Sequence, residues 1–60
     1  MFSIGDKFYD EKNGRYLTIY GKSRDTCLCT VEEMDEECNF YEIGDQLFSE
    51  CELSCFIRQE

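Results

Sequence analysis

The sequence predicts one small α+β domain, residues 1–60, in which about four antiparallel strands form a small β-barrel and a short helix ends the chain. Three observations lead to this prediction. A chain of 60 residues has the length of one small domain. Short aromatic and β-branched segments alternate with turn residues along most of it. A helix-start signal stands about ten residues before the end. The apolar fraction of 42% also excludes the composition of a disordered chain.

The first two strands are predicted to form a hairpin. Residues 7–10 carry two aromatic side chains, and Arg15 to Tyr20 is rich in aromatic and β-branched residues, as strands are. Between them lies Asn13-Gly14, the strongest short signal for a hairpin turn, because both positions of the favoured turn need a positive φ.

Two further strands are predicted after a turn at residues 21–25. Thr26 to Val31 alternates, so that Cys27, Cys29 and Val31 share one face of a strand. Residues 38–43 are expected to be the fourth strand. Short strands joined by tight turns are typical of SH3-like and similar antiparallel barrels.

The segment from Ser49 to Arg58 allows two interpretations. As a helix, it would begin with a capping box made by Ser49 and Glu52, and Leu53 would lie on its apolar face. As a strand, its apolar residues and cysteines would point inward by simple alternation. The capping box favours the helix.

Charge is unevenly distributed along the chain, whose net charge is −8. Residues 1–24 carry five basic and three acidic side chains, whereas residues 25–60 carry eleven acidic side chains and one basic one. The surplus of negative charge argues against direct binding to nucleic acid. No apolar run approaches the roughly 20 residues of a membrane helix, so no membrane insertion is expected. The first residues lack the apolar core of a signal peptide.

Five cysteines are the candidate metal ligands. A chain this short usually needs extra stabilisation from disulfides, a bound metal or oligomerisation. An odd number of cysteines without a secretory signal argues for a cytoplasmic protein with thiols rather than disulfides. Two pairs have spacings that project both sulfurs the same way, and without histidine a zinc site must be all-cysteine. The sequence therefore predicts a closed structural zinc site, with Cys38 as a spare and these ligands: Cys27, Cys29, Cys51 and Cys55.

The alternative for the cysteines is that they are small apolar side chains of the core. Acidic neighbours support this alternative, because Glu50 and Glu52 flank Cys51 and carboxylates raise the pKa of a thiol. Neither pair has the C-x-x-C spacing that is common in zinc knuckles and ribbons.

An acidic segment at residues 32–37 is the candidate partner-binding site. Its carboxylates would attract a basic protein and speed association; they are Glu32, Glu33, Asp35, Glu36 and Glu37. The alternative is a solvated loop between two strands. A calcium loop is disfavoured because the segment has no central glycine.

Catalysis is not predicted. The chain contains no histidine, no glycine-rich phosphate loop and no nucleophile with a base near it in the sequence. We therefore expect a binding protein rather than an enzyme.

The whole chain resembles the small type II anti-CRISPR proteins, phage-encoded inhibitors of Cas9, and in particular a zinc-containing member of that group. The similarity lies in size, charge and cysteine content, together with the Ile4-Gly5-Asp6-Lys7-Phe8 opening, the Asn13-Gly14 turn and the Ser49-Glu50-Cys51-Glu52-Leu53 ending. The resemblance implies an inhibitor that acts in the bacterial cytoplasm by binding a basic, nucleic-acid-handling surface of the nuclease.

A second class of function is also compatible with the sequence. An SH3-like accessory module of a phage or host complex would bind a peptide or protein in an aromatic groove. The aromatic residues available for such a groove are Phe8, Tyr9, Tyr16, Tyr20 and Tyr41.

Overall fold

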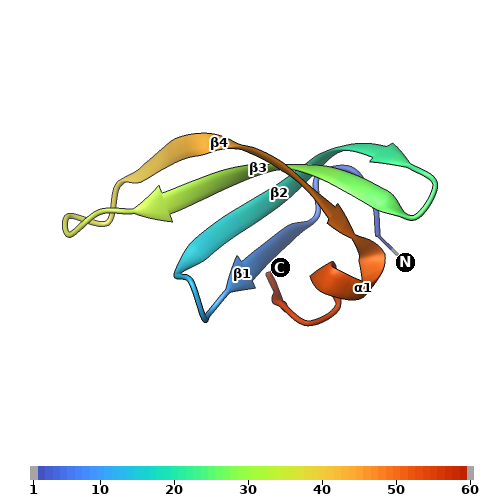
Figure 1. The fold of residues 1–60 in the computed structure, drawn as a ribbon. Helices are drawn as coiled ribbons and strands as arrows, with labels where there is room; N and C mark the ends of the chain where they lie inside the picture. The colour runs from blue at the N-terminus through green and yellow to red at the C-terminus, as the bar shows by residue number, and fades with distance from the viewer. Residues whose placement is uncertain (1, 60) are drawn as a thin grey trace.

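The computed structural model describes residues 2–59 as a single antiparallel sheet with one helical turn (Figure 1). In sheet order the strands are β4-β3-β2-β1-β5, so β4 and β5 form the two edges. The elements, in chain order, are β1 (Lys7–Asp10), β2 (Arg15–Ser23), β3 (Thr26–Met34), β4 (Phe40–Ser49), α1 (Glu50–Leu53) and β5 (Ile57–Gln59).

The β1–β2 hairpin is confirmed. Gly14 has a φ of 65°. Asn13 is not among the described residues with a positive φ, so the turn is not the two-residue type that needs a positive φ at both positions; it spans residues 11–14, and the Gly14 N–H donates to the Asp10 carbonyl oxygen at 2.8 Å. The carboxylate of Asp10 is buried, and its two oxygens accept hydrogen bonds from the backbone N–H (3.3 Å) and the side-chain amide (2.7 Å) of Asn13. The turn therefore satisfies the one buried charged side chain found within residues 2–59.

Strand β3 has the predicted alternation but extends further than predicted. Cys27, Cys29 and Val31 are buried on one face. The strand continues through Glu32 and Glu33 to Met34, so half of the acidic segment lies in the sheet rather than in a loop. Strand pairing with both β2 and β4 holds these residues extended.

The fourth strand differs from the prediction for residues 38–43. It begins at Phe40 and runs to Ser49, while Cys38 lies in the preceding turn with a φ of 66°. A bulge places Ile43 as an extra residue of β4, and Gly44, with a φ of 152°, tolerates the distorted backbone. The glycine therefore bends the strand instead of ending it.

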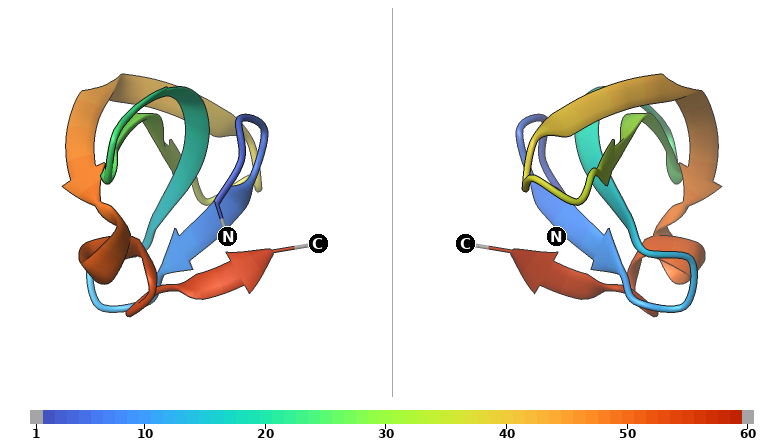
Figure 2. Two further views of the ribbon diagram at one scale, coloured as in Figure 1. Left: turned by 90° about the vertical axis from the view of Figure 1, so that its right-hand side faces the viewer. Right: turned by 90° about the vertical axis from the view of Figure 1, so that its left-hand side faces the viewer.

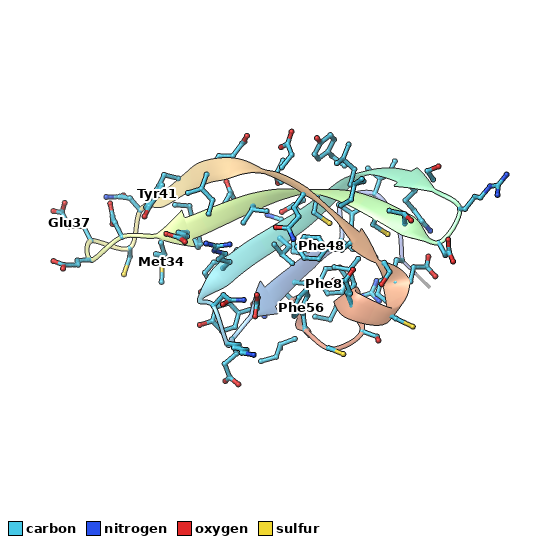
Figure 3. The ribbon with its side chains drawn as sticks, viewed as in Figure 1. Phe8, Met34, Glu37, Tyr41, Phe48 and Phe56 are labelled. Carbon is cyan, nitrogen blue, oxygen red and sulfur yellow. The ribbon has the colours of Figure 1, made fainter. Side chains whose placement is uncertain are left out.

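The core lies between the sheet and the segment that follows β4. Phe8, Phe48 and Phe56 gather there, below β4 and beside α1 (Figure 3). Phe2 and Phe56 pack, partly buried, against the buried core residues. The buried set consists of Phe8, Leu17, Ile19, Cys27, Cys29, Val31, Phe48 and Leu53.

The sheet curls around this core but does not close, so the predicted barrel is wrong in that respect (Figure 2). Closure would require β4 to pair with β5, and these strands remain at opposite edges of the sheet. The helical turn α1 connects them instead, and it covers one end of the core.

The helix interpretation of the C-terminal segment is partly correct, whereas the inward alternation of a strand is wrong, because Cys51, Cys55 and Ile57 are exposed. The capping box is present: Ser49 Oγ accepts from the Glu52 N–H at 3.1 Å, and Glu52 Oε1 accepts from the Ser49 N–H at 2.9 Å. The helix ends after one turn, and Ile57 to Gln59 then pair with β1. Leu53 is fully buried as predicted, whereas Ile57 lies on an edge strand and is 49% exposed.

Candidate protein-binding surface

The predicted zinc ligands lie in two different environments. Cys27 and Cys29 are fully buried on the core face of β3. Cys51 and Cys55 are exposed around α1, where the Cys55 thiol lies 3.6 Å from the carbonyl oxygen of Cys51. Cys38 is exposed at the β3–β4 turn. Cys27 and Cys29 share one face of β3 as predicted, whereas Cys55 lies beyond the end of α1 and so does not share a helical face with Cys51.

The cysteines are not gathered into a four-sulfur site among the described residues. Within residues 2–59 no group of three or more cysteine, aspartate or glutamate side chains is placed to hold a metal ion. Burial raises the pKa of the Cys29 thiol to about 11 and also raises that of Cys27, so both thiols disfavour the thiolate form that binds zinc. Zinc binding stays a prediction that measurement of metal content must test.

The acidic segment is divided between structural and exposed carboxylates. Glu33 is held in place, since one of its oxygens accepts from Arg15 Nε at 3.2 Å and the other from the Tyr41 hydroxyl at 3.1 Å. Asp35 shapes the turn, because its Oδ1 accepts from the backbone N–H groups of Glu37 and Asn39, each at 2.9 Å. These two residues therefore stabilise the hairpin.

The remaining carboxylates of the segment are Glu32, which is half-buried, and Glu36 and Glu37, which are exposed. Glu36 and Glu37 are exposed at the tip of the β3–β4 hairpin, which extends away from the core (Figure 3). Glu32 lies opposite Glu42 of β4, on the face of the sheet away from the core. From Thr26 to Ile57 the chain contains no lysine or arginine. The hairpin is thus a projecting surface of one charge sign.

An aromatic row crosses the outer face of the sheet next to these carboxylates. The rings of Tyr9 and Tyr16 lie 4.7 Å apart, and those of Tyr16 and Phe40 meet edge to face at 5.0 Å. Phe40 is 54% exposed, and Met34 lies opposite it in β3. Sequence reasoning listed Tyr9 and Tyr16 but missed Phe40, whose role depends on the register of β4.

The other aromatic candidates do not join this row. Phe8 lies in the core. The hydroxyl groups of Tyr20 and Tyr41 donate hydrogen bonds to Asp45 and Glu33, which raises the pKa of each tyrosine above its ordinary value. These two hydroxyls connect carboxylates to the sheet rather than line a groove.

A groove of about 490 Å³ lies on the core side of the sheet. Its apolar wall includes Leu17, Val31, Phe48 and Phe56. Asp10 to Asn13 of the β1–β2 turn bound it on one side, and the α1–β5 segment bounds it on another. Neither the sequence alternation nor the composition indicates this groove, because it depends on how the sheet curls.

Comparison with known proteins finds no matching protein family, no matching curated protein and no matching solved structure. In the part of the chain that the structure describes, no helix is long and apolar enough to cross a membrane.

Proposed function

We propose that this protein is an inhibitory binding protein that covers a basic, nucleic-acid-handling surface of a host protein. The observation that carries the proposal is the β3–β4 hairpin, a projecting element with seven carboxylates and no basic residue. A field of one sign attracts an oppositely charged surface and speeds association with it. The seven residues are Glu32, Glu33, Asp35, Glu36, Glu37, Glu42 and Asp45.

Binding rather than catalysis is the role that these groups support. The hydroxyls of Tyr20 and Tyr41 donate to Asp45 and Glu33, which raises the pKa of each tyrosine further above neutral pH. Glu33 and Asp35 are engaged in the hairpin's own hydrogen bonds. The carboxylates thus act as a charged surface without a paired nucleophile.

The order of the elements supports an SH3-like relationship as part of the proposal. Four strands follow one another as neighbours in the sheet, a single helical turn comes next, and β5 returns beside β1. This connectivity is that of an opened SH3-like barrel, a fold whose members commonly bind peptides and proteins.

The resemblance to anti-CRISPR proteins names Cas9 as the first partner to test. We expect the protein to inhibit DNA cleavage by Cas9 and to bind the nuclease more weakly as salt is raised, because screening shortens the reach of the hairpin's field. A variant with Glu32→Gln, Glu36→Gln and Glu37→Gln should associate about tenfold more slowly at low salt. It keeps Glu33 and Asp35, so the hairpin should stay folded.

A control removes negative charge away from the hairpin tip and the groove. Changing Asp25→Asn at the exposed β2–β3 turn, next to Arg24, should leave association almost unchanged. Three outcomes would contradict the inhibitor proposal. They are affinity for Cas9 that is the same at low and at high salt, affinity for Cas9 no greater than for other basic proteins, and no binding to Cas9 at all.

The aromatic row favours the second function, an SH3-like interaction module. Tyr9, Tyr16 and Phe40 together present an exposed apolar surface to a peptide. For this function, partner binding should depend weakly on salt and should be lost in Tyr16→Ala. The two functions are therefore separated by comparing how much added salt and how much Tyr16→Ala each lower the affinity for the partner.

A further inference from the structure

Strand β4 forms one edge of the sheet; at its last residue, Ser49, the backbone N–H already donates to Glu52 Oε1. It is the last strand of the sheet, and it spans ten residues, whereas β5 at the other edge spans three. An edge strand presents unpaired backbone N–H and C=O groups, to which an extended segment of another chain can add. Leu47, 62% exposed, lies beside this edge.

The two faces of β4 differ in chemistry. Phe48 lies opposite Cys27 on the core face and lines the groove together with Gln46. On the outer face, Asp45 lies opposite Thr30, and Glu42 lies opposite Glu32. Side chains of a strand alternate between the two faces. A strand added to β4 would therefore direct alternate residues toward an apolar groove and toward carboxylates.

Charge determines which chain can add to this edge. A second copy of this protein would bring its own Glu42 and Asp45 against the same residues, and like charges facing each other destabilise strand pairing. The groove itself has mixed charge: Glu11 and Glu52 line it together with Lys12 and Arg15, and Arg15 is paired with Glu33. The charged side chains on the outer face of β4 are both carboxylates, Glu42 and Asp45, which favours a basic segment.

We propose that the open edge of β4 and the adjoining groove form a docking site for an extended segment of a partner protein in which apolar residues alternate with lysine or arginine. The apolar side chains enter the groove against Phe48 and Phe56, and the cationic ones lie beside Asp45 and Glu42. This inference rests on the proposed function, for which it supplies the mode of contact with a basic partner.

The test uses the whole protein and a blocked seven-residue peptide of alternating lysine and leucine as the probe. In amide NMR spectra, we expect saturable shifts at Gln46, Leu47 and Phe48 and at Phe56 across the groove. Each lost charge pair weakens binding by a few-fold, so an alternating glutamate–leucine peptide should bind at least about tenfold more weakly. Methylating the backbone nitrogens of the lysine–leucine peptide blocks strand pairing and should have a similar effect.

Matched variants test the position of the site. Asp45→Lys should weaken binding of the lysine–leucine peptide about fivefold or more, whereas Glu36→Lys makes the same charge change at the hairpin tip and should weaken it less than about twofold. If Asp45→Lys does not fold, Glu42→Lys replaces it. Shifts spread over the hairpin tip, equal effects of the two lysine variants, or full affinity of the methylated peptide would overturn the proposal.

The outcome is separable from that of the proposed function. Inhibition of Cas9 with no peptide binding at β4 would overturn only the docking site. Peptide binding at β4 with no inhibition of a nucleic-acid-handling protein would leave the docking site in place and remove the inhibitor function.

Discussion

The cysteines show how position in the sheet determines the chemistry of a side chain. Cys27 and Cys29 have no exposed surface, and their neighbours in the core include Val31 and Phe48. Apolar surroundings raise the pKa of a thiol, and such thiols pack as small apolar side chains. Cys51 and Cys55 belong to the same residue type but face solvent.

Thiol labelling should therefore divide the cysteines into two classes. In the native protein, a thiol reagent should modify Cys38, Cys51 and Cys55 quickly, because all three are exposed. Cys27 and Cys29 should react only through unfolding, at least about a hundredfold more slowly. Mass spectrometry of digested samples, taken at intervals, measures both rates. The same experiment in denaturant is the control, in which all five should react alike.

Stability should fall in alkaline solution because of the same burial. Below pH 9 the Cys29 thiol is protonated in both states. Between about pH 9 and pH 11 the unfolded chain loses this proton while the native protein keeps it, so the free energy of unfolding decreases as pH rises. The raised pKa of Cys27 acts in the same direction.

Urea unfolding at pH 7, 9 and 10 measures this dependence. The double variant Cys27→Ala and Cys29→Ala should lose less stability over this range than the parent chain. Above pH 10, Tyr20 and Tyr41 contribute in the same sense because their pKa values are also raised, so the comparison is best made below that pH. An identical slope in both proteins would show that the buried thiols do not control the effect.

Among the secondary-structure elements, sequence patterns predicted the features that depend on residues close together in the chain. The Asn13-Gly14 turn and the Ser49–Glu52 capping box each depend on residues within four positions of one another, and both are present. The limits of β4 depend instead on pairing with β3, which continues past Gly44 by means of a bulge. Likewise, the helix ends early because β1 pairs with Ile57 to Gln59.

The capping box should be essential to the position of α1. In Ser49→Ala the Glu52 N–H loses its side-chain acceptor, and the free energy of unfolding should fall by about 1 kcal/mol. Ser23→Ala, at the exposed end of β2, changes the same atoms and should cost less than about 0.5 kcal/mol. Urea denaturation of the three proteins measures both differences. Equal stability of the two variants would contradict the role of the cap.

For the whole molecule, the question is whether the core needs a metal. Sequence spacing indicated that Cys27 and Cys29 share a face, but it did not show that this face meets the core; their role as zinc ligands stays a prediction. The groove beside β4 was also missed, because it depends on the curl of the whole sheet. Both are properties of long-range packing, which short sequence windows do not contain.

Metal removal distinguishes the two interpretations of the cysteines. If Cys27 and Cys29 serve as core side chains, a chelator should leave the melting temperature unchanged within about 1 °C. A four-sulfur site predicts a large decrease and about one equivalent of zinc in the purified protein. Elemental analysis together with thermal unfolding, with and without chelator, decides between them. Cys38→Ser is the control, since neither interpretation assigns it a structural role.

The charge of the whole chain predicts that salt stabilises the fold. A net charge of −8 on 60 residues produces self-repulsion in the native protein, concentrated in the β3–β4 hairpin. Salt also screens the ion pairs that join Arg15 to Glu33, Lys22 to Glu50 and Arg58 to Asp6. These exposed pairs contribute at most about 1 kcal/mol each, and often much less, so relief of the repulsion should dominate.

We therefore expect the melting temperature to rise by about 5 °C as sodium chloride increases from a few millimolar to the molar range, where the screening length falls to about 3 Å. The variant with Glu32→Gln, Glu36→Gln and Glu37→Gln should start from a higher melting temperature and rise less, because part of the repulsion has been removed already. A melting temperature that falls with salt would mean that the ion pairs outweigh the repulsion within the hairpin. Repulsion among the hairpin carboxylates would then not lower the free energy of unfolding, and a basic partner that neutralised them would not stabilise the fold.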